Sequence, residues 1–355
     1  MKIVYICERP YNLFRTLLKA VNSDDEMDIV ISNNIRSMDL IVDELSSCGL
    51  FNNVFYFNDL RHKQFSHPLK TYKSKSTNKL KSIKRAIVSA FHVVVGFFDY
   101  LKSQRKAKHI KLPKGLDFED YDEIHITDCT SILNFYLYHK KYENLVYVEH
   151  AKDALSGNYA KITDFLQIFV KLRIIYGIRG SCRYIKAIEV NKNENLISDT
   201  KNKEIREVPL HSLLQNLSIE QKEFIYQLYA KSYNLNFPNN SIIDVFLTTQ
   251  IDGESDSRVY VYLCNEVIAQ FMADSDYIIL KPHPNDNTDY SCILEKYPDV
   301  VLVPSCFSAE VFSFSSSLKI RKLINIDTSA TSVFNSVEEV ITLGPEFAEK
   351  CRNAM

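Results

Sequence analysis

Residues 277–286 read YIILKPHPND, an apolar strand that runs directly into a turn holding two prolines. The segment before it follows the same plan, because the apolar strand IIDVFLTTQ (242–250) leads into a helical pattern over 257–272. The alternation continues with a helix at 289–296, the strand VVLVP (300–304), a short helix at 308–316, the strand KLINI (322–326) and a helix from Thr331. Strands that alternate with helices predict a parallel sheet with helices on both faces. Residues 241–355 are therefore expected to form one doubly wound domain.

The first part of the chain shows the same alternation. Strand patterns occupy 2–7, 27–32, 53–57, 123–127 and 144–150, with helical patterns at 11–21, 37–48 and 131–141 between them. Further strands at 184–190 and 204–210 and a helix at 219–232 complete this part. We expect residues 1–240 to form a second domain, interrupted by a basic helical insertion at about 61–114. The predicted class is α/β, with two doubly wound Rossmann-like domains.

The composition excludes several classes of function. Of the 355 residues, 46% are hydrophobic and 25% are charged, as in a globular protein. The net charge of -1 gives no field toward nucleic acid, so no nucleic-acid partner is expected. With eight glycines and no GxGxxG or Walker A pattern, no NAD, FAD or ATP site of the usual kinds, and no other cofactor, is predicted. The eight cysteines form no C-x-x-C pair and no H-E-x-x-H occurs, so no metal site is predicted.

The N-terminus and the basic insertion bear on location. The opening MKIVYICERPY has the pattern of a strand rather than a signal peptide, and the longest apolar stretch, 86–98, is too short to span a membrane as a helix. A cytoplasmic protein with reduced cysteines is therefore expected. The insertion 61–114 holds fifteen lysines and arginines and one acid, Asp99. We expect it to contact the cytoplasmic membrane surface; a solvated helix and a patch for an anionic acceptor are the alternatives.

His283 is the first candidate functional residue. It lies between Pro282 and Pro284, which fix the backbone and remove two amide donors, and it follows Lys281 at the end of a strand. Ligands of doubly wound sheets bind at the carboxyl ends of the strands. An imidazole held there suits hydrogen bonding to a phosphate, or protonating it as it leaves. The alternative is a turn in which the histidine packs locally.

Other strand ends of the same domain carry polar residues. LTTQ places Thr249 and Gln250 after the first strand, and Glu310 begins a short helix after the third. A carboxylate there could bind a ribose diol or could simply favour the first helical turn. The segment TSATS brings Thr328, Ser329 and Thr331 to the start of an expected helix, which is an anion site as well as a helix cap.

The first domain offers a candidate general base. The segment YVEHAKDALSGNY (147–159) ends an apolar strand and continues into a loop with a glycine. It brings Glu149, His150 and Asp153 together, and a carboxylate there could accept a proton from an acceptor hydroxyl. A solvated loop is the alternative.

These motifs resemble those of bacterial sialyltransferases, namely glycosyltransferase family 52 and the related polysialyltransferases. KPHP after a strand, a following P…AE and the later TSATS look like the family's HP and Ser-Ser motifs, and LTTQ resembles its Thr-Gln turn. The opening VYICERPYNL resembles the family's first strand and its entry to the first helix. The resemblance is good over 242–335, fair over 1–35 and poor over 60–240.

The resemblance implies a GT-B fold, in which two domains face across a cleft. It also implies an inverting, metal-independent transfer of sialic acid from CMP-sialic acid to a glycan acceptor of capsule or lipooligosaccharide. His283 would contact the CMP phosphate, together with Ser329 and either Thr328 or Thr331. Glu310 would lie near the cytidine ribose, and the remaining nucleotide-binding residues would be Thr249, Gln250, Lys281 and Pro284.

The expected base departs from the family pattern. The family places its base in an acidic-acidic-Gly motif, whereas this chain has Glu149, His150 and Ala151. If the loop holds an insertion, Asp153 is the base, and this is the alignment that we favour over Glu149. Because of the departure, a different donor or acceptor and a non-catalytic binder of sugar nucleotides or glycans stay open. A sugar-nucleotide epimerase is a further alternative, since GT-B-like sheets also occur in such enzymes.

Overall fold

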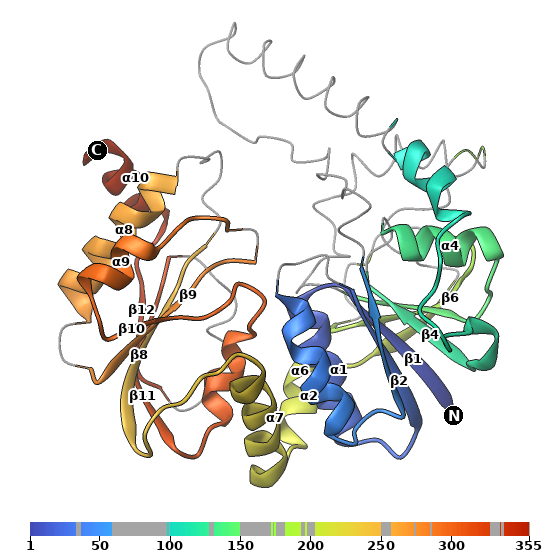
Figure 1. Ribbon diagram of the computed structural model, residues 1–355, viewed down its shortest axis with the longest axis horizontal. Helices are drawn as coiled ribbons and strands as arrows, with labels where there is room; N and C mark the ends of the chain where they lie inside the picture. The colour runs from blue at the N-terminus through green and yellow to red at the C-terminus, as the bar shows by residue number, and fades with distance from the viewer. Residues whose placement is uncertain are drawn as a thin grey trace, which may run out of the picture. The chain divides into compact units, whose positions relative to one another are not determined.

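The computed structural model describes most of the chain as two compact units (Figure 1). The described residues are 1–32, 37–58, 98, 100–127, 131–149, 172, 174, 182–192, 196, 203–249, 257–272, 275–284, 286–326, 334 and 337–354. Unit 1 comprises Met1–Glu8, Asp24–Asn34 and Phe51–Ser212, and unit 2 comprises Arg9–Ser23, Ile35–Leu50 and Leu213–Met355. The units follow packing rather than one boundary in the sequence, and the division at 240/241 stays a prediction.

Unit 1 is built on a seven-stranded sheet in the order β3-β2-β1-β4-β5-β6-β7, and every neighbouring pair is parallel. The strand order reverses between β1 and β4, so the crevice of this sheet lies at the carboxyl ends of those two strands. The strands are β1 (Lys2–Cys7), β2 (Glu26–Ser32), β3 (Asn53–Phe57), β4 (Glu123–Ile126), β5 (Leu145–Val148), β6 (Ile185–Val190) and β7 (Glu204–Glu207).

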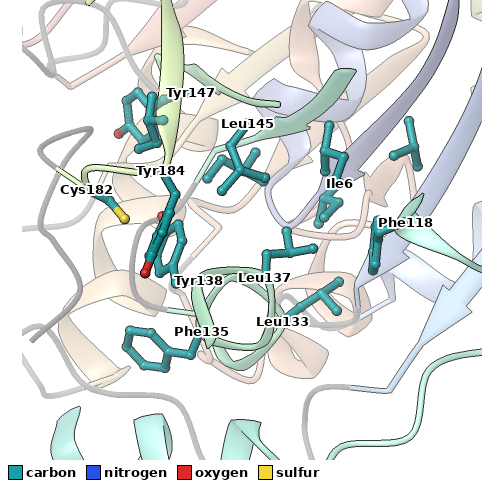
Figure 2. Close-up of a cluster of buried hydrophobic side chains, with 14 of the residues drawn as sticks. Ile6, Phe118, Leu133, Phe135, Leu137, Tyr138, Leu145, Tyr147, Cys182 and Tyr184 are labelled. Carbon is teal, nitrogen blue, oxygen red and sulfur yellow. The ribbon is translucent and has the colours of Figure 1, made fainter. Parts of the chain in front are cut away.

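The core of unit 1 forms between this sheet and helix α4 (Ile132–Lys140). Ser131 begins the helix, because its hydroxyl accepts a hydrogen bond from the Asn134 amide at 3.1 Å. Figure 2 shows Leu133 and Leu137 of α4 beside Ile6 and Leu145 of the sheet, and all four side chains are buried. The nearly continuous apolar strands therefore belong to a sheet that is covered.

Unit 2 holds a five-stranded parallel sheet in the order β10-β9-β8-β11-β12. The order reverses between β8 and β11, which places the crevice of this sheet at the ends of those strands. The strands are β8 (Ser241–Leu247), β9 (Tyr277–Lys281), β10 (Val300–Leu302), β11 (Leu318–Asn325) and β12 (Val337–Thr342).

Two sets of helices belong to unit 2. Helices α8 (Ser257–Phe271), α9 (Ser291–Lys296) and α10 (Pro345–Ala354) lie together beside the sheet and share one apolar core with it (Figure 1). Helix α1 (Pro10–Ala20), helix α7 (Ile219–Ser232) and the 3-10 helix η6 (Ala309–Phe314) are joined by aromatic contacts. The ring pairs are Phe14–Phe314, Tyr229–Phe307 and Phe307–Phe312, with centroids 5.7, 5.3 and 4.7 Å apart.

The shorter helices complete the described elements. They are η1 (Met38–Ile41), α2 (Val42–Ser47), η3 (Phe118–Asp120) and α6 (Leu210–Gln215). Within the described ranges, no helix is both long enough and apolar enough to cross a membrane. Residues 61–97 and 99 of the basic insertion lie outside the described residues, so its expected membrane contact stays a prediction.

The predicted class is confirmed, since both units contain a doubly wound parallel sheet of the kind that the GT-B class requires. One expected element is wrong: the helix from Thr331 does not run on through 337–342, where β12 forms the edge of the sheet. Four of its six residues, in the sequence VEEVIT, are exposed, which fits a strand at the solvated edge of the sheet. Glu338 of this edge strand pairs with Lys319 of the neighbouring β11 at 2.7 Å. Charged side chains on an edge strand disfavour pairing with a strand of another molecule.

A buried ion pair fixes the register of β11. The pairing with β8 shifts between Ile320 and Lys322, and Arg321 lies in this bulge. The Arg321 guanidinium donates to both carboxylate oxygens of Asp244 on β8, and the Lys322 amide donates to one of them at 3.1 Å. The Asp244 side chain is fully buried. The bulge therefore aims the cation at a carboxylate that has no access to water.

Replacing Arg321 with methionine should destabilise the protein strongly. The change leaves the Asp244 carboxylate buried without its cation, which typically costs about 3–5 kcal/mol. The matched control is Lys319→Met, which breaks an exposed pair and should cost less than about 1 kcal/mol. Urea unfolding of the two variants and the parent measures both values. Equal unfolding midpoints for the two variants would contradict this role for the pair.

Candidate functional site

The candidate site lies at the carboxyl edge of the unit 2 sheet. Thr248 and Thr249 follow β8, Lys281 ends β9, and Ile326 follows β11. The ladder between β8 and β9 ends with Leu247 opposite Lys281, after which the Thr248 amide donates to the Lys281 carbonyl at 3.0 Å. Because parallel strands end at one edge, the polar segments after β8 and β9 are brought side by side.

The structure holds both backbone polar groups of His283. Its amide donates to the Thr248 hydroxyl at 2.9 Å, and its carbonyl accepts from the Asp286 amide at 2.8 Å. The side chain is half-buried, as is Pro284. The sequence-based expectation of a stiff turn is therefore met in the backbone, and the turn places the imidazole at the edge where a ligand of this sheet would bind.

Asp286 supports this turn and was not predicted as a site residue. One carboxylate oxygen, Oδ2, accepts from the Tyr290 hydroxyl at 2.6 Å and from the Thr248 hydroxyl at 3.4 Å. The other, Oδ1, accepts from the Thr288 amide at 2.8 Å. That last contact is an Asx turn, and the sequence N-D-N-T was the available signal for it.

Lys281 bridges two loops. Its ammonium donates to the Pro282 carbonyl and, at 3.1 Å, to the Ser305 carbonyl, and the residue is 6% exposed. Burial lowers the pKa of this ammonium to about 8, against the opposing charge of Glu310. Lys281 therefore links the His283 turn to the loop after β10, and two of its donor contacts go to backbone carbonyls within the protein.

Glu310 lies near this lysine in η6 and is half-buried. Burial raises the pKa of its carboxyl group, and the Lys281 charge partly offsets that rise. The ammonium of Lys281 and the carboxyl group of Glu310 interact at the same edge of the sheet. The low dielectric of a buried site strengthens this interaction. A ligand hydroxyl or phosphate at this edge would meet both signs of charge.

Several predicted site residues fall outside the described residues. These are His150, Asp153, Gln250, Thr328, Ser329 and Thr331. Their roles stay predictions. The described strands nevertheless fix where their segments begin, since Thr249 precedes Gln250 after β8 and Ile326 precedes the TSATS segment after β11.

The Glu149 carboxylate is hydrogen-bonded within the protein. This carboxylate follows β5 and is 3% exposed. Its Oε2 atom accepts from the Asn191 backbone amide at 3.0 Å and from the Asn191 side-chain amide at 3.2 Å. The Asn191 side-chain oxygen in turn accepts from the Leu210 amide at 3.1 Å, at the start of α6. Glu149 thus ties the ends of β5 and β6 to the next helix.

Polar groups also gather where the strand order of unit 1 reverses, and the sequence patterns did not single them out. Glu8 follows β1, and its Oε2 atom accepts from the Asn134 side-chain amide of α4 at 3.5 Å. Both residues are buried, as is Thr127 at the end of β4. The sequence did contain a signal for this cluster, because Glu8 directly follows one predicted strand and Thr127 ends another.

Comparison with known proteins identifies a family. The family model described as "Glycosyltransferase family 52" matches residues 72–341, more than half of the chain. No curated protein sequence matches. The matched range begins inside the basic insertion and ends in β12, so it includes both the 149–153 segment and the whole KPHP site.

Similar solved structures span almost the whole chain at low identity. A sialyltransferase GT-B domain from Photobacterium damselae is 12% identical with a TM-score of 0.44, over 96% of this chain and 89% of that one. A UDP-GlcNAc 2-epimerase from Methanocaldococcus jannaschii, in complex with UDP-GlcNAc and UDP, is 13% identical with a TM-score of 0.46, over 100% and 92%. MnaA from S. aureus with UDP is 12% identical with a TM-score of 0.46, over 99% and 87%.

The contribution of Lys281 to the stability of the protein should rise with pH. Unfolded, this lysine keeps its proton up to about its ordinary pKa of 10.5, whereas folded it releases the proton near 8. The unfolded state therefore binds more protons between these values, and unfolding becomes less favourable as pH increases. The gain is on the order of 3 kcal/mol at about 1.4 kcal/mol per pKa unit.

Urea unfolding between pH 7 and pH 10 measures this gain as a difference between the parent and Lys281→Met. The difference should shift in favour of the parent as pH rises. The exposed-lysine control Lys319→Met should follow the pH dependence of the parent. A parallel pH dependence for the parent and Lys281→Met would show that Lys281 does not titrate in this window.

Proposed function

The chain belongs to glycosyltransferase family 52 and is a glycosyltransferase, and from this premise we propose that it transfers sialic acid from CMP-sialic acid to a glycan acceptor, with inversion and without a metal. The observation that carries the proposal is the His283 turn, pinned at the carboxyl edge of the unit 2 sheet. This edge is where doubly wound sheets bind nucleotides.

The donor site is proposed to form around this turn. The His283 imidazole and the hydroxyls of Thr328, Ser329 and Thr331 hold the CMP phosphate, as the resemblance implies. Thr249 and Gln250 lie along the nucleotide, and Glu310 accepts from the ribose hydroxyls. Lys281 stabilises the turn, since its ammonium donates to the Pro282 carbonyl.

The reaction follows from the charges that move. The acceptor hydroxyl oxygen forms a bond to the anomeric carbon while the bond from that carbon to the phosphate oxygen breaks, and attack from the opposite face inverts the configuration. The acceptor proton goes to the general base, and CMP leaves with one more negative charge. Donors preorganised around that charge, His283 first among them, lower the barrier by roughly 2.7–4 kcal/mol each in comparable sites.

Asp153 is the proposed base, in preference to Glu149 and His150. The Oε2 atom of the Glu149 carboxylate accepts two hydrogen bonds from Asn191, so this oxygen is already used within the protein. Its 3% exposure also leaves little of it open to a substrate hydroxyl. Asp153 lies outside the described residues, and the alignment with an insertion in the 149–153 segment is what supports it as the base.

The acceptor is proposed to be a glycan of capsule or lipooligosaccharide that is linked to a lipid at the cytoplasmic face of the membrane. The support is the charge of the insertion 61–114, with fifteen cations and one acid around an apolar stretch. Such a segment is attracted to anionic lipid at about 1 kcal/mol per cation near the surface. The proposed location is the cytoplasm, with peripheral contact to that membrane.

CMP should bind this protein selectively, and the histidine turn should carry much of the affinity. Calorimetric titration with CMP, UDP and GDP in the presence of EDTA is the measurement. His283→Ala should weaken CMP binding about ten- to a hundredfold, because a hydrogen bond to a charged group is worth about 1.5–3 kcal/mol. His211→Ala, at an exposed histidine of α6, is the matched control and should bind CMP as the parent does.

Three results would count against this assignment. A preference for UDP would remove the CMP donor and favour the sugar-nucleotide epimerase. Binding that requires metal would remove the metal-independent mechanism. CMP binding without any transfer from CMP-sialic acid, across a panel of sialylated and galactose-terminated acceptors, would favour a binding protein over an enzyme.

Substitutions of the two carboxylates in the 149–153 segment should affect different quantities. Asp153→Asn should lower kcat by roughly 10²–10⁴-fold, the usual contribution of a general base, and leave CMP affinity unchanged. Glu149→Gln should instead lower the free energy of unfolding by about 1–2 kcal/mol, because it weakens the contacts with Asn191. Single-turnover kinetics and urea unfolding measure the two effects. A kcat loss confined to Glu149→Gln would assign the base to Glu149.

A further inference from the structure

We propose that Thr248, with its hydroxyl oriented by Asp286, is a positioning residue that sets the place of His283 for the nucleotide phosphate. The inference rests on the proposed function, in which His283 contacts that phosphate. It concerns two residues that neither the sequence motifs nor the family resemblance assigned. Every contact that supports it lies within unit 2.

The first step is the scarcity of amide donors in the turn. Residues 282–284 read Pro-His-Pro, so the His283 amide is the single backbone donor of this segment. It does not continue the ladder between β8 and β9, whose last pair is Leu247 with Lys281. It donates instead to the Thr248 hydroxyl at 2.9 Å. One side-chain oxygen thus holds the only amide that the segment has.

The second step is how that oxygen is held. Thr248 is 5% exposed, and its own amide donates to the Lys281 carbonyl at 3.0 Å. Its β-branched side chain has few rotamers. While its oxygen accepts from His283, its hydroxyl proton points to Asp286 Oδ2 at 3.4 Å. In this contact the Thr248 hydroxyl is the donor and the Asp286 oxygen is the acceptor.

The third step is how Asp286 closes the arrangement. Its amide donates to the His283 carbonyl at 2.8 Å, so one residue acts on the turn twice, directly and through Thr248. Its carboxylate is anchored by the hydroxyl of Tyr290, which is 2% exposed, at 2.6 Å. The result is a closed ring of hydrogen bonds through His283, Thr248 and Asp286.

Such a ring matters because a phosphate contact depends on where the donor already stands. A donor that is fixed before the ligand arrives loses no conformational freedom on binding. Without the Thr248 oxygen, the His283 amide would have to find water, and the imidazole would sample positions away from the phosphate. We therefore expect an effect on affinity rather than on the fold.

The experiment compares Thr248→Val, which keeps the shape and removes the hydroxyl, with Thr248→Ser, which restores it. Thr248→Val should weaken CMP binding about three- to tenfold, the range for one lost hydrogen bond, while Thr248→Ser should bind within about twofold of the parent. The matched control is Thr342→Val, which removes another accepting hydroxyl of the same sheet, bonded by Asn325 at 3.0 Å. It should leave CMP affinity unchanged.

A second readout does not depend on nucleotide. Selective ¹⁵N labelling of the nine histidines allows amide exchange at His283 to be followed by NMR. Exchange should be faster in Thr248→Val than in the parent and should return toward the parent rate in Thr248→Ser. A general loss of structure would accelerate the other histidine amides as well, and this pattern separates positioning from unfolding.

The outcomes distinguish the inference from the proposed function. Parent-like CMP affinity and parent-like His283 exchange in Thr248→Val would overturn the inference while the proposed function stands. A parent protein that binds no CMP would overturn the proposed function. In that case the exchange data decide alone: faster exchange in Thr248→Val supports the positioning of His283, and unchanged exchange overturns it.

Discussion

The parallel pairing of β8 with β9 is the constraint on which the candidate site depends. Its last pair joins Leu247 and Lys281, and Thr248 and His283 follow within two residues of that pair. A shift of one residue would turn each side chain to the other face of the sheet. Lys281 would then leave the loop carbonyls that it bridges, and the Thr248 oxygen would no longer meet the His283 amide.

Charge at this edge is arranged at a cost to stability. Lys281 keeps a buried ammonium whose pKa is lowered to about 8 by desolvation, and Glu310 keeps a carboxyl whose pKa is raised for the same reason. A hydrophobic pair of equal volume would often be neutral or more stable. The arrangement is accounted for if a ligand brings further charge and hydroxyl groups to the edge. The Asp244–Arg321 pair differs, because it lies within the ladder and fixes the bulge of β11.

Local patterns predicted what depends on local chemistry. Strand and helix periodicity predicted both doubly wound sheets, and the positions of Lys281 and His283 at a strand end follow from the sequence alone. The patterns missed the partner of His283, because Thr248 is 35 residues away along the chain. They also missed β12, whose exposed face carries charge. Nor does any periodicity show that α1 packs with η6, where the Ser308 hydroxyl donates to the Pro10 carbonyl at 3.2 Å.

The contrast between Glu149 and His283 shows what makes a strand-end residue a candidate for chemistry. Both follow an apolar strand, and both looked functional in the sequence. Glu149 uses its carboxylate, the reactive part, to hold Asn191. At His283 the backbone is what the protein holds, through Thr248 and Asp286. Support that acts on the main chain fixes where a side chain starts. By this criterion Glu149 serves the fold, whereas the contact of His283 with a ligand stays a prediction.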